Sequence, residues 1–338
     1  MSIRGTSFKN PNNINVKGEQ PIKVKMREML KNSSDIMSLI IALIILCVVF
    51  SLISPHFFKV QNILNIGIAA SIMGIMAAGL TVAMLLGGMD VSQYAIVAVV
   101  GTVIAMMVRA NQPIGLAIAA GIAVSIGCGA INGFSVAILK ISPIITTLAT
   151  MLIYRGLAYY LTEAKTLMVT NNFLNTLGRG YTLGVPNTVW IMVVIYILIY
   201  YLLKYTAYGR KVFAVGGNPQ ASFLSGINLK QIRFWAFVVS AGAAGLAGVT
   251  MVAQVGAAMP NVGETALMDV ITAVILGGIS LSGGKGKISG TLMGVLILAT
   301  LNNGMVLVGI QSFYQMIVKG FVILLAVYID VLRGGGFK

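Results

Sequence analysis

Charged side chains are scarce in this chain of 338 residues: Asp, Glu, Lys and Arg together make up only 9% of it, whereas 58% of the residues are hydrophobic. A soluble protein carries about 25% charged residues. The mean hydropathy of +0.94 agrees with this deficit, and several apolar runs reach the ~20 residues that a helix needs to cross a bilayer. Backbone polar groups cannot stay unpaired in lipid, so these runs should be helical. The scarcity of charge therefore excludes a soluble domain and predicts an all-α polytopic membrane protein.

Residues that build catalytic and metal sites are also scarce. The chain has one histidine, His56, and two cysteines, Cys47 and Cys128, which lie inside apolar runs. One loop histidine does not complete a Ser/His/Asp set, and the cysteines lack metal-ligand spacing. A phosphate-binding GxxxxGK[ST] sequence is also missing. We therefore expect this chain to be no enzyme, to hold no metal or cofactor, and not to hydrolyse ATP through a P-loop.

Ten apolar segments are predicted to cross the membrane as helices. They cover approximately residues 36–54, 65–86, 93–108, 114–139, 143–161, 188–203, 232–253, 265–279, 289–306 and 314–330. The eighth segment is short and is expected either to break or to tilt at Gly277–Gly278. The chain accordingly divides into a basic leader (1–35), a membrane domain (36–332) with a polar loop (204–231), and a short tail (333–338).

The distribution of basic residues predicts the orientation of the chain. If the N-terminus lies in the cytoplasm, only four basic residues fall outside, namely Lys59, Arg109, Lys165 and Arg179. Seventeen fall inside, namely Arg4, Lys9, Lys17, Lys23, Lys25, Arg27, Lys31, Lys140, Lys204, Arg210, Lys211, Lys230, Arg233, Lys285, Lys287, Arg333 and Lys338. Cytoplasmic loops are enriched in Lys and Arg, so both termini and the loop 204–231 are expected in the cytoplasm. Because these residues are spread along the chain, the net charge of +15 does not indicate a nucleic-acid partner.

The loop between the sixth and seventh predicted spans is unusually elaborate. It carries Arg210 and Lys211, turns at Gly216–Pro219, and continues as a helix-like run from Gln220 to Gly226. Connections between spans are mostly short, so a cationic loop with its own turn and helix is expected to be a docking surface for a cytosolic partner. Nothing else in the chain supplies energy, and we expect that partner to do so.

Three of the eight acidic residues, Asp90, Glu264 and Asp269, lie near or within apolar segments, where ionisable groups are costly and often functional. Asp90 stands at the start of the third span and either caps that helix or has a functional role. Asp269 either caps or pairs across the bundle with Arg155, and Lys319 either snorkels or pairs in a similar way. We favour structural pairing for both cations.

Polar side chains also occur at the centres of predicted spans, namely Asn132, Thr146, Thr147, Asn302 and Asn303. A pathway for a neutral polar solute needs hydroxyl and amide groups without fixed charge, and these residues meet that need. The alternative is hydrogen bonding between helices, for which Asn and Thr are common in membrane bundles. The small residues 241–248 are expected to form a closely packed helix face.

One internal echo stands out in the sequence. Residues 85–92, LLGGMDVS, resemble residues 275–282, ILGGISLS. Paired glycine-interrupted segments in two halves of a chain are a pointer to transporters built from repeats. The alternative interpretation is that such pairs recur by chance in a chain with 39 glycines.

A series of short motifs runs through the chain in a fixed order. They are Gly87–Ser92, Asn132–Gly133, Ile145–Leu148, Arg155–Gly156, Gly209–Arg210, Gly217–Pro219, Ala221, Gly226–Ile227, Asp269, Gly277–Gly278, Gly283–Gly284, Lys319–Gly320, Ala326–Val327 and Asp330. In this order and number they resemble the membrane permease subunits of bacterial ABC importers for monosaccharides, of the ribose, galactoside, xylose and arabinose type. The resemblance covers about residues 36–332, which would make this region a transmembrane permease domain.

The resemblance implies several partners. They are a cytoplasmic ABC ATPase subunit, a periplasmic or lipoprotein sugar-binding protein, and a second permease copy, either in a homodimer or as a paralogue, all in or at the lipid of the bacterial inner membrane. In this family the loop matching residues 209–227 forms a coupling helix in a cleft of the ATPase. The residues expected to couple to the ATPase are Arg210, Gly217, Asn218, Pro219, Ala221 and Gly226. Those expected to line the substrate pathway or its gates are Asp90, Ser92, Asn132, Thr146, Thr147, Asp269, Asn302 and Asn303.

Two positions depart from the family pattern. Leu267 stands where a Glu is frequent, and Gln93–Tyr94 follow Ser92 where Val-Gly is usual. The solute is thus left open between a monosaccharide and another small polar molecule such as a nucleoside or a polyol. A second hypothesis is an ion-coupled secondary transporter, which requires a buried carboxylate, with Asp90 or Asp269 as the candidate.

Overall fold

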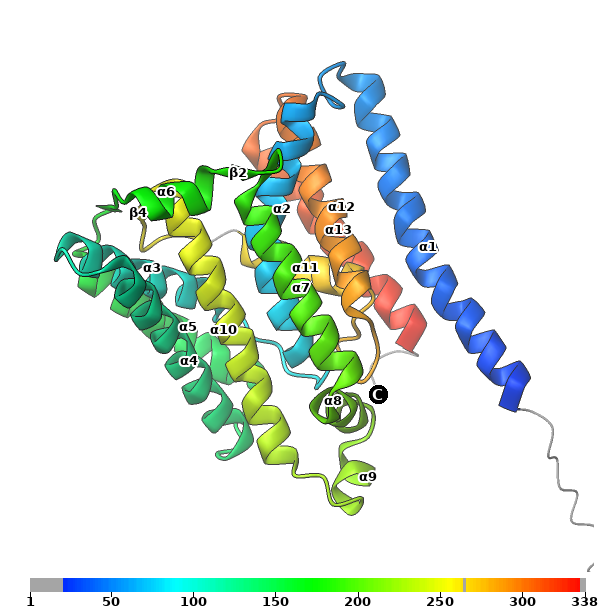
Figure 1. Ribbon diagram of the computed structural model, residues 1–338. Coiled ribbons are helices and arrows are strands. Elements are labelled where there is room, and N and C mark those ends of the chain that lie inside the picture. Colours follow the sequence, from blue (N-terminus) through cyan, green and yellow to red (C-terminus); the bar gives the residue numbers. More distant parts are fainter. Residues whose placement is uncertain (1–20, 264–265, 335–338) are drawn as a thin grey trace, which may run out of the picture.

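Long apolar segments dictate the architecture, since each satisfies its backbone hydrogen bonds internally as a helix. The structure, a computed structural model, describes residues 21–263 and 266–334, and the side chains of residues 36–263 and 266–331 (Figure 1). The helices are α1 (Pro21–Ile53), α2 (Val60–Met84), α3 (Gln93–Arg109), α4 (Ile114–Ala137), α5 (Pro143–Thr162), α6 (Asn172–Arg179), α7 (Asn187–Tyr205), α8 (Ala207–Gly217), α9 (Pro219–Leu224), α10 (Leu229–Val255), α11 (Leu267–Leu276), α12 (Ile288–Leu307) and α13 (Ser312–Gly334).

Two pairs of very short strands complete the secondary structure of the described residues. Strand β1 (Leu167–Met168) pairs antiparallel with β4 (Ala257–Ala258). Strand β2 (Tyr181–Thr182) pairs antiparallel with β3 (Val185–Pro186). All four lie with α6 at one end of the bundle (Figure 1).

The prediction of an all-α polytopic membrane protein is confirmed. Within the described residues, eight helices are long and apolar enough to cross a membrane, namely α1, α2, α4, α5, α7, α10, α12 and α13. The other two predicted spans correspond to α3, with 17 residues, and α11, with 10 residues, which are shorter than a full crossing. A count of ten spans and the orientation of the termini therefore stay predictions. Residues 1–20 of the predicted leader and 335–338 of the tail lie outside the described residues, as does Glu264.

The eighth predicted span ends at its glycine pair. Helix α11 stops at Leu276, Gly277 is its C-terminal cap, and Gly278 adopts a φ of +85°, which favours glycine. Of the two outcomes expected there, a break or a tilt, the structure has the break. A break at this position shortens α11 to about half the length of a span.

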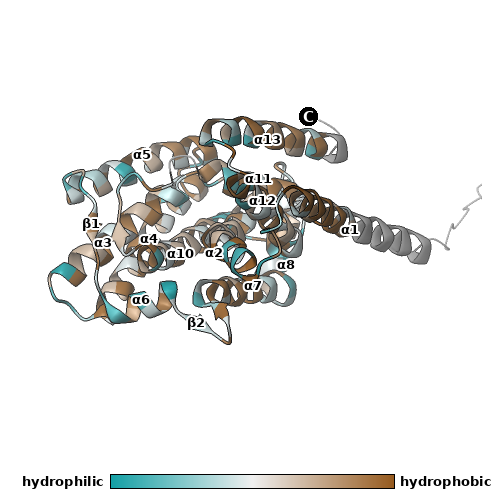
Figure 2. Ribbon diagram, turned by 90° about the horizontal axis from the view of Figure 1, so that it is seen from above, coloured by the Kyte–Doolittle hydropathy of each residue, from teal (hydrophilic) through white to brown (hydrophobic). Residues whose placement is uncertain are grey.

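The core of the bundle lies along α2 and α10, which are mostly buried, whereas α1 and α13 lie at its periphery. Seen from above, α5 and α13 run along one edge of the molecule and α7 lies on the opposite side (Figure 2). Small residues allow α10 to pack closely, as expected for residues 241–248. A side chain at Gly129 of α4 would lie 2.8 Å from the Phe237 carbonyl oxygen of α10, and one at Gly245 would collide with Ser125.

The two halves of the sequence echo meet at one end of the bundle. A side chain at Gly87 of the first half would lie 3.5 Å from the Ser282 carbonyl oxygen of the second half. Two residues beyond the second half, the Gly284 amide donates a 2.8 Å hydrogen bond to the carbonyl of Leu85, the residue that follows α2. The end of α8 packs against the same place, because a side chain at Gly216 would collide with the Leu85 carbonyl and the Gly284 amide. We call this end, formed by α8, α9 and the turns 85–92, 138–142 and 277–287, the α9 end. Whether the echo marks a structural repeat stays a prediction.

Candidate functional site

The polar loop 204–231 folds into two consecutive helices, each started by a local side-chain cap. Thr206 Oγ1 accepts a hydrogen bond from the Gly209 amide at 3.1 Å and begins α8. Asn218 Oδ1 accepts one from the Ala221 amide at 2.9 Å, and Pro219 is the first residue of α9. A capping Asn followed by Pro is a strong start signal for a helix, because the fixed φ of proline suits its first position. The loop is therefore preformed, with α9 projecting at the lower end of Figure 1.

Helix α9 presents apolar side chains that the rest of the described chain does not cover. Phe223 is 66% exposed and Leu224 is 85% exposed, whereas Ser222 is buried and faces the bundle. Exposed apolar groups clustered on a projecting element mark an interaction surface. The chain then turns at Gly226, whose φ of +80° lies in the left-handed region. Sequence analysis did not single out Phe223 and Leu224, although an apolar pair in a polar loop was the signal for them.

The residues predicted to couple to an ATPase lie together on this element. Arg210 is exposed on α8, Gly217 ends α8, and Gly226 follows α9. Asn218, Pro219 and Ala221 form the exposed start of α9. A hydrogen bond of 3.2 Å from the Tyr208 hydroxyl to the Ile232 carbonyl joins α8 to α10. Helix α8 therefore contacts both α10 and, through Gly216, the turn that follows α2.

A buried carboxylate lies where α3 begins. Asp90 has 0% exposure. Its Oδ1 accepts hydrogen bonds from the Ser92 hydroxyl at 2.6 Å and from the Ser92 amide at 3.1 Å. Its Oδ2 accepts a 2.8 Å hydrogen bond from the hydroxyl of Ser240 in α10. The three donors satisfy the carboxylate inside the bundle. The expected helix-capping role of Asp90 is wrong, because Ser92 holds the N-cap position of α3 and Asp90 bonds the Ser92 amide, which precedes the first helical residue, Gln93.

Further hydrogen bonds extend this cluster to α4 and α5. Asn132 Nδ2 donates to the Ser92 hydroxyl at 2.8 Å. The Tyr154 hydroxyl donates to Asn132 Oδ1 at 3.3 Å and to the Cys128 carbonyl at 3.0 Å. Gln93 Nε2 donates to the Ser240 hydroxyl at 3.0 Å. These side chains link α3, α4, α5 and α10 through hydrogen bonds. Sequence analysis did not predict the contribution of Tyr154 and Ser240.

Thr147, another predicted pathway residue, also makes contacts within the bundle. Its hydroxyl is buried and accepts a hydrogen bond from the Val91 amide at 3.3 Å. Its single proton has two acceptors, the Pro143 carbonyl of its own helix at 2.9 Å and the Met89 carbonyl at 3.2 Å. It therefore ties α5 to the chain just before α3. Thr147 joins Asp90, Ser92 and Asn132 as a predicted pathway residue whose polar atoms are already occupied.

A second polar cluster joins α11, α12 and α13. Lys319 Nζ lies 2.7 Å from Asp269 Oδ2, and Asn302 Nδ2 donates to the same oxygen at 3.2 Å. Asp269 thus takes Lys319 as its cation, whereas Arg155 donates to the Val262 carbonyl at 3.3 Å. The sequence suggested an ion pair between Asp269 and Arg155. The structure instead pairs Asp269 with Lys319, because α13 packs beside α11.

Three predicted pathway residues keep unused hydrogen-bonding capacity. The Thr146 hydroxyl and the side-chain carbonyl oxygens of Asn302 and Asn303 are buried without a hydrogen-bond partner among the described residues. Buried polar atoms are usually paired, so unpaired ones need an explanation. These three differ in this respect from the fully bonded set of Asp90, Ser92, Asn132 and Thr147.

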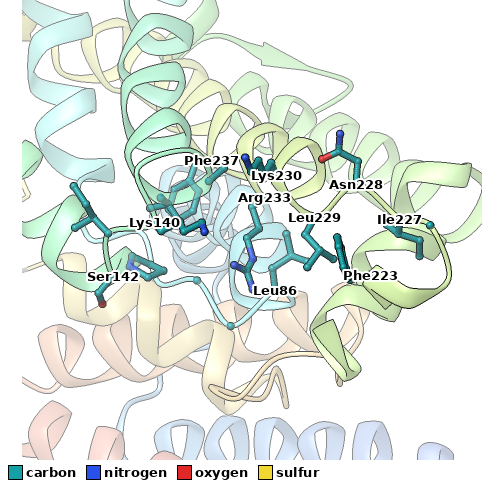
Figure 3. Close-up of a pocket in the computed structure, with 17 residues that line it drawn as sticks. Leu86, Lys140, Ser142, Phe223, Ile227, Asn228, Leu229, Lys230, Arg233 and Phe237 are labelled. Carbon is teal, nitrogen blue, oxygen red and sulfur yellow. The ribbon is translucent and has the colours of Figure 1, made fainter. Parts of the chain in front are cut away.

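A cavity of about 910 Å³ opens at the α9 end, next to α9 itself. Its walls come from the turn after α2, the turn between α4 and α5, and the segment from Phe223 to Phe237 (Figure 3). Three basic residues line it, namely Lys140, Lys230 and Arg233, and no acidic residue does. Sequence analysis treated these cations only as determinants of orientation.

Comparison with known proteins places the chain among transport proteins. The pattern of the family described as "Branched-chain amino acid transport system / permease component" matches residues 62–327. The ribose import permease protein RbsC of Haemophilus influenzae is 41% identical over 300 residues, which are 87% of this chain and 92% of that protein. RbsC of Bacillus subtilis is 40% identical over 292 residues, 86% of this chain and 91% of that protein. The L-arabinose transport system permease protein AraH of Escherichia coli is 34% identical over 288 residues, 85% and 87% of the two chains. No solved structure matches significantly.

Proposed function

The chain belongs to the family of branched-chain amino acid transport system permease components, and from this premise we propose that it forms the translocation pathway of an ATP-driven monosaccharide importer. The observation that carries this proposal is its 41% identity to a ribose import permease along 92% of that protein. A permease component is a multi-pass protein of the bacterial inner membrane and not the catalytic subunit of its system. ATP hydrolysis is assigned to a separate subunit.

The choice of a sugar over an amino acid follows from the relatives. The family is named for branched-chain amino acids, whereas the relatives described above, RbsC and AraH, are named for ribose and L-arabinose. The polar groups with unused capacity, on Thr146, Asn302 and Asn303, are neutral hydroxyl and amide groups. Neutral groups of this kind can hydrogen-bond the hydroxyl groups of a sugar. An amino acid carries an ammonium and a carboxylate group, and neutral groups do not balance those charges. We assign contacts with the passing solute to these three residues.

The ATPase is proposed to dock on α9. The exposed Phe223 and Leu224 supply the apolar contact that a cleft in a partner would bury, and Arg210 supplies an exposed positive charge on the preceding helix α8. Closure of the ATPase would push α9, and α8 would pass the movement to Leu85 and Gly284. These residues belong to the turns after α2 and α11, so both turns would shift together and change access to the pathway. The α9 end then faces the cytoplasm.

The remaining partners are proposed to meet other faces. A sugar-binding protein would deliver solute to the end that carries α6, opposite α9. A second permease copy, or a paralogue, would pack on the edge formed by α5 and α13, where large apolar side chains are exposed, among them Leu152, Ile153, Phe321 and Leu324. Lipid would cover the other apolar surfaces.

Purification and reconstitution test this proposal. The chain is isolated in mild detergent from its native membrane, the proteins that accompany it are identified, and the complex is placed in liposomes with the binding protein. Sugar uptake that requires ATP and a stoichiometric ATPase subunit supports the importer. Uptake by the chain alone, driven by an ion gradient without ATP, would replace it with a secondary transporter that uses Asp90 or Asp269.

A further inference from the structure

The cavity at the α9 end combines mostly apolar walls with three basic side chains. Apolar side chains form most of its lining, including Leu86, Val136 and Phe237. The basic side chains come from two separate elements, because Lys140 lies in the turn between α4 and α5 whereas Lys230 and Arg233 belong to α10. In Figure 3 the charged ends of Lys140 and Arg233 point toward each other. An amphipathic ligand with an anionic group would match such a lining.

No described carboxylate neutralises these cations. The ion pairs among the described residues join Lys165 to Glu163 and Lys319 to Asp269, and neither pair lies at the cavity. Lys140, Lys230 and Arg233 form no ion pair or side-chain hydrogen bond with another described residue. Cations that converge in one cavity without a counter-charge repel one another, and an anion between them removes that cost.

The surroundings of the cavity resemble the boundary between headgroups and hydrocarbon. Ile131, Phe134 and Ile138 are exposed along one face of α4, and Ile141, which lines the cavity, follows shortly after them. Trp235 of α10 is also exposed, two residues after Arg233. Tryptophan is enriched where a membrane helix meets the headgroup layer. The exposed stripe on α4 thus offers a path for a hydrocarbon chain whose headgroup sits among the cations.

We propose that this cavity binds the phosphate headgroup of an anionic phospholipid from the cytoplasmic leaflet, with Lys140 and Arg233 as its main contacts. Basic pockets between membrane helices on the cytoplasmic side are suited to such headgroups. The cavity is also lined by Phe223 and Gly226, so a bound lipid touches the end of the coupling element itself. The inference rests on the orientation in the proposed function, but not on transport, ATPase or solute.

Lipid binding by the purified full-length chain tests the proposal. Dioleoyl phosphatidylglycerol is titrated into detergent micelles that contain the protein, and bound lipid is counted by native mass spectrometry, with dioleoyl phosphatidylcholine as the uncharged comparison. The K140Q/R233Q variant removes two cations from the cavity. The K285Q/K287Q variant removes two exposed cations from the same end but outside the cavity.

The expected result is saturable binding of phosphatidylglycerol that K140Q/R233Q weakens roughly 30-fold, since each basic residue near a headgroup contributes about fivefold. K285Q/K287Q should stay within about twofold of the wild type. If the double variant does not remain monodisperse, K140Q alone, with an expected loss of about fivefold, serves the same purpose.

Several outcomes would overturn the proposal. Equal losses in both double variants would show a general surface attraction, and equal binding of phosphatidylcholine would show that charge plays no part. Displacement of the lipid by millimolar inorganic phosphate would identify a site for free anions. Complete displacement by the purified ATPase would identify the cavity as part of the protein interface. None of these results would bear on whether the chain is a sugar permease.

Discussion

Lys319 of α13 holds Asp269 of α11 in an ion pair with a separation of 2.7 Å between Nζ and Oδ2. The side chains are 26% and 12% exposed, so the pair is largely shielded by the bundle. Most of the large side chains of α13 are exposed, among them Phe313, Phe321 and Tyr328. A polar link to α11 and α12 therefore contributes much of the specific contact that positions this peripheral helix.

We expect Lys319→Met to destabilise the protein by roughly 2–3 kcal/mol, because Asp269 then keeps a shielded charge without its cation. The cost is lower than for a fully buried pair because the two side chains are 26% and 12% exposed, so solvent already weakens their attraction. Thermal unfolding in detergent measures the effect. The double variant with Asp269→Asn removes the orphaned charge and should recover most of the loss. A double variant as unstable as Lys319→Met would contradict the role of the charge.

The contact between α8 and the turn after α2 leads to a second prediction. Gly216→Ala should destabilise the protein by about 1–3 kcal/mol, because the new methyl group collides with the Leu85 carbonyl and the backbone must move. Gly217 is a matched control, since a side chain there meets nothing within 4 Å. Unfolding temperatures should separate Gly216→Ala from Gly217→Ala. Similar unfolding temperatures for the two variants would mean that Gly216 is not in close contact with the Leu85 carbonyl.

A third prediction concerns docking on α9. Replacing both Phe223 and Leu224 with Ser should reduce co-purification of the ATPase at least tenfold, because the two exposed side chains form the apolar part of the contact. Leu183→Ser is the control, as this side chain is 88% exposed in the loop between β2 and β3, away from the α9 end. Undiminished ATPase recovery with the double variant would place the docking surface elsewhere.

Two further changes on this element report on coupling. Ala221→Asp should separate ATP hydrolysis from transport while the protein stays in the membrane, because it places a charge on the exposed start of α9. A bulky residue at Gly226 should have the same effect, but the left-handed φ of +80° also strains any side chain there. Normal transport with Ala221→Asp would count against the coupling role.

The fourth prediction distinguishes solute contacts from helix contacts. Asn303→Leu should raise the substrate concentration needed for half-maximal uptake severalfold with little change in stability, because its side-chain carbonyl has no partner to lose. Asn132→Leu should instead lower the unfolding temperature, because it breaks the bonds to Ser92 and Tyr154, at about 0.5–1.5 kcal/mol for each lost bond, while both hydroxyls keep their bonds to Asp90 and Cys128. Uptake kinetics and unfolding are measured on both variants. Unchanged uptake by Asn303→Leu would return this residue to a packing role.

The sequence alone determined the class of the protein and the nature of its loops. Residues such as Asn218 and Pro219 act locally, since a capping amide and a fixed φ start α9 wherever the chain is placed. Apolar runs of membrane-spanning length likewise require helices whatever their neighbours, and the glycine pair at Gly277 marked an irregularity whose form, a break, the structure decided. Local chemistry was sufficient for these features.

Only the tertiary structure decided which polar groups meet. Asp269 and Lys319 are separated by 50 residues, and Asp90 and Ser240 by 150 residues, so their partners depend on how the helices pack. The same packing distinguishes Asn132, whose side-chain nitrogen and oxygen both have partners, from Asn303, whose side-chain carbonyl oxygen has none among the described residues. It also gathers Lys140 and Arg233 into one cavity. Composition reports how many such groups a chain has, but their pairing is fixed by contacts between distant segments, which one sequence does not contain.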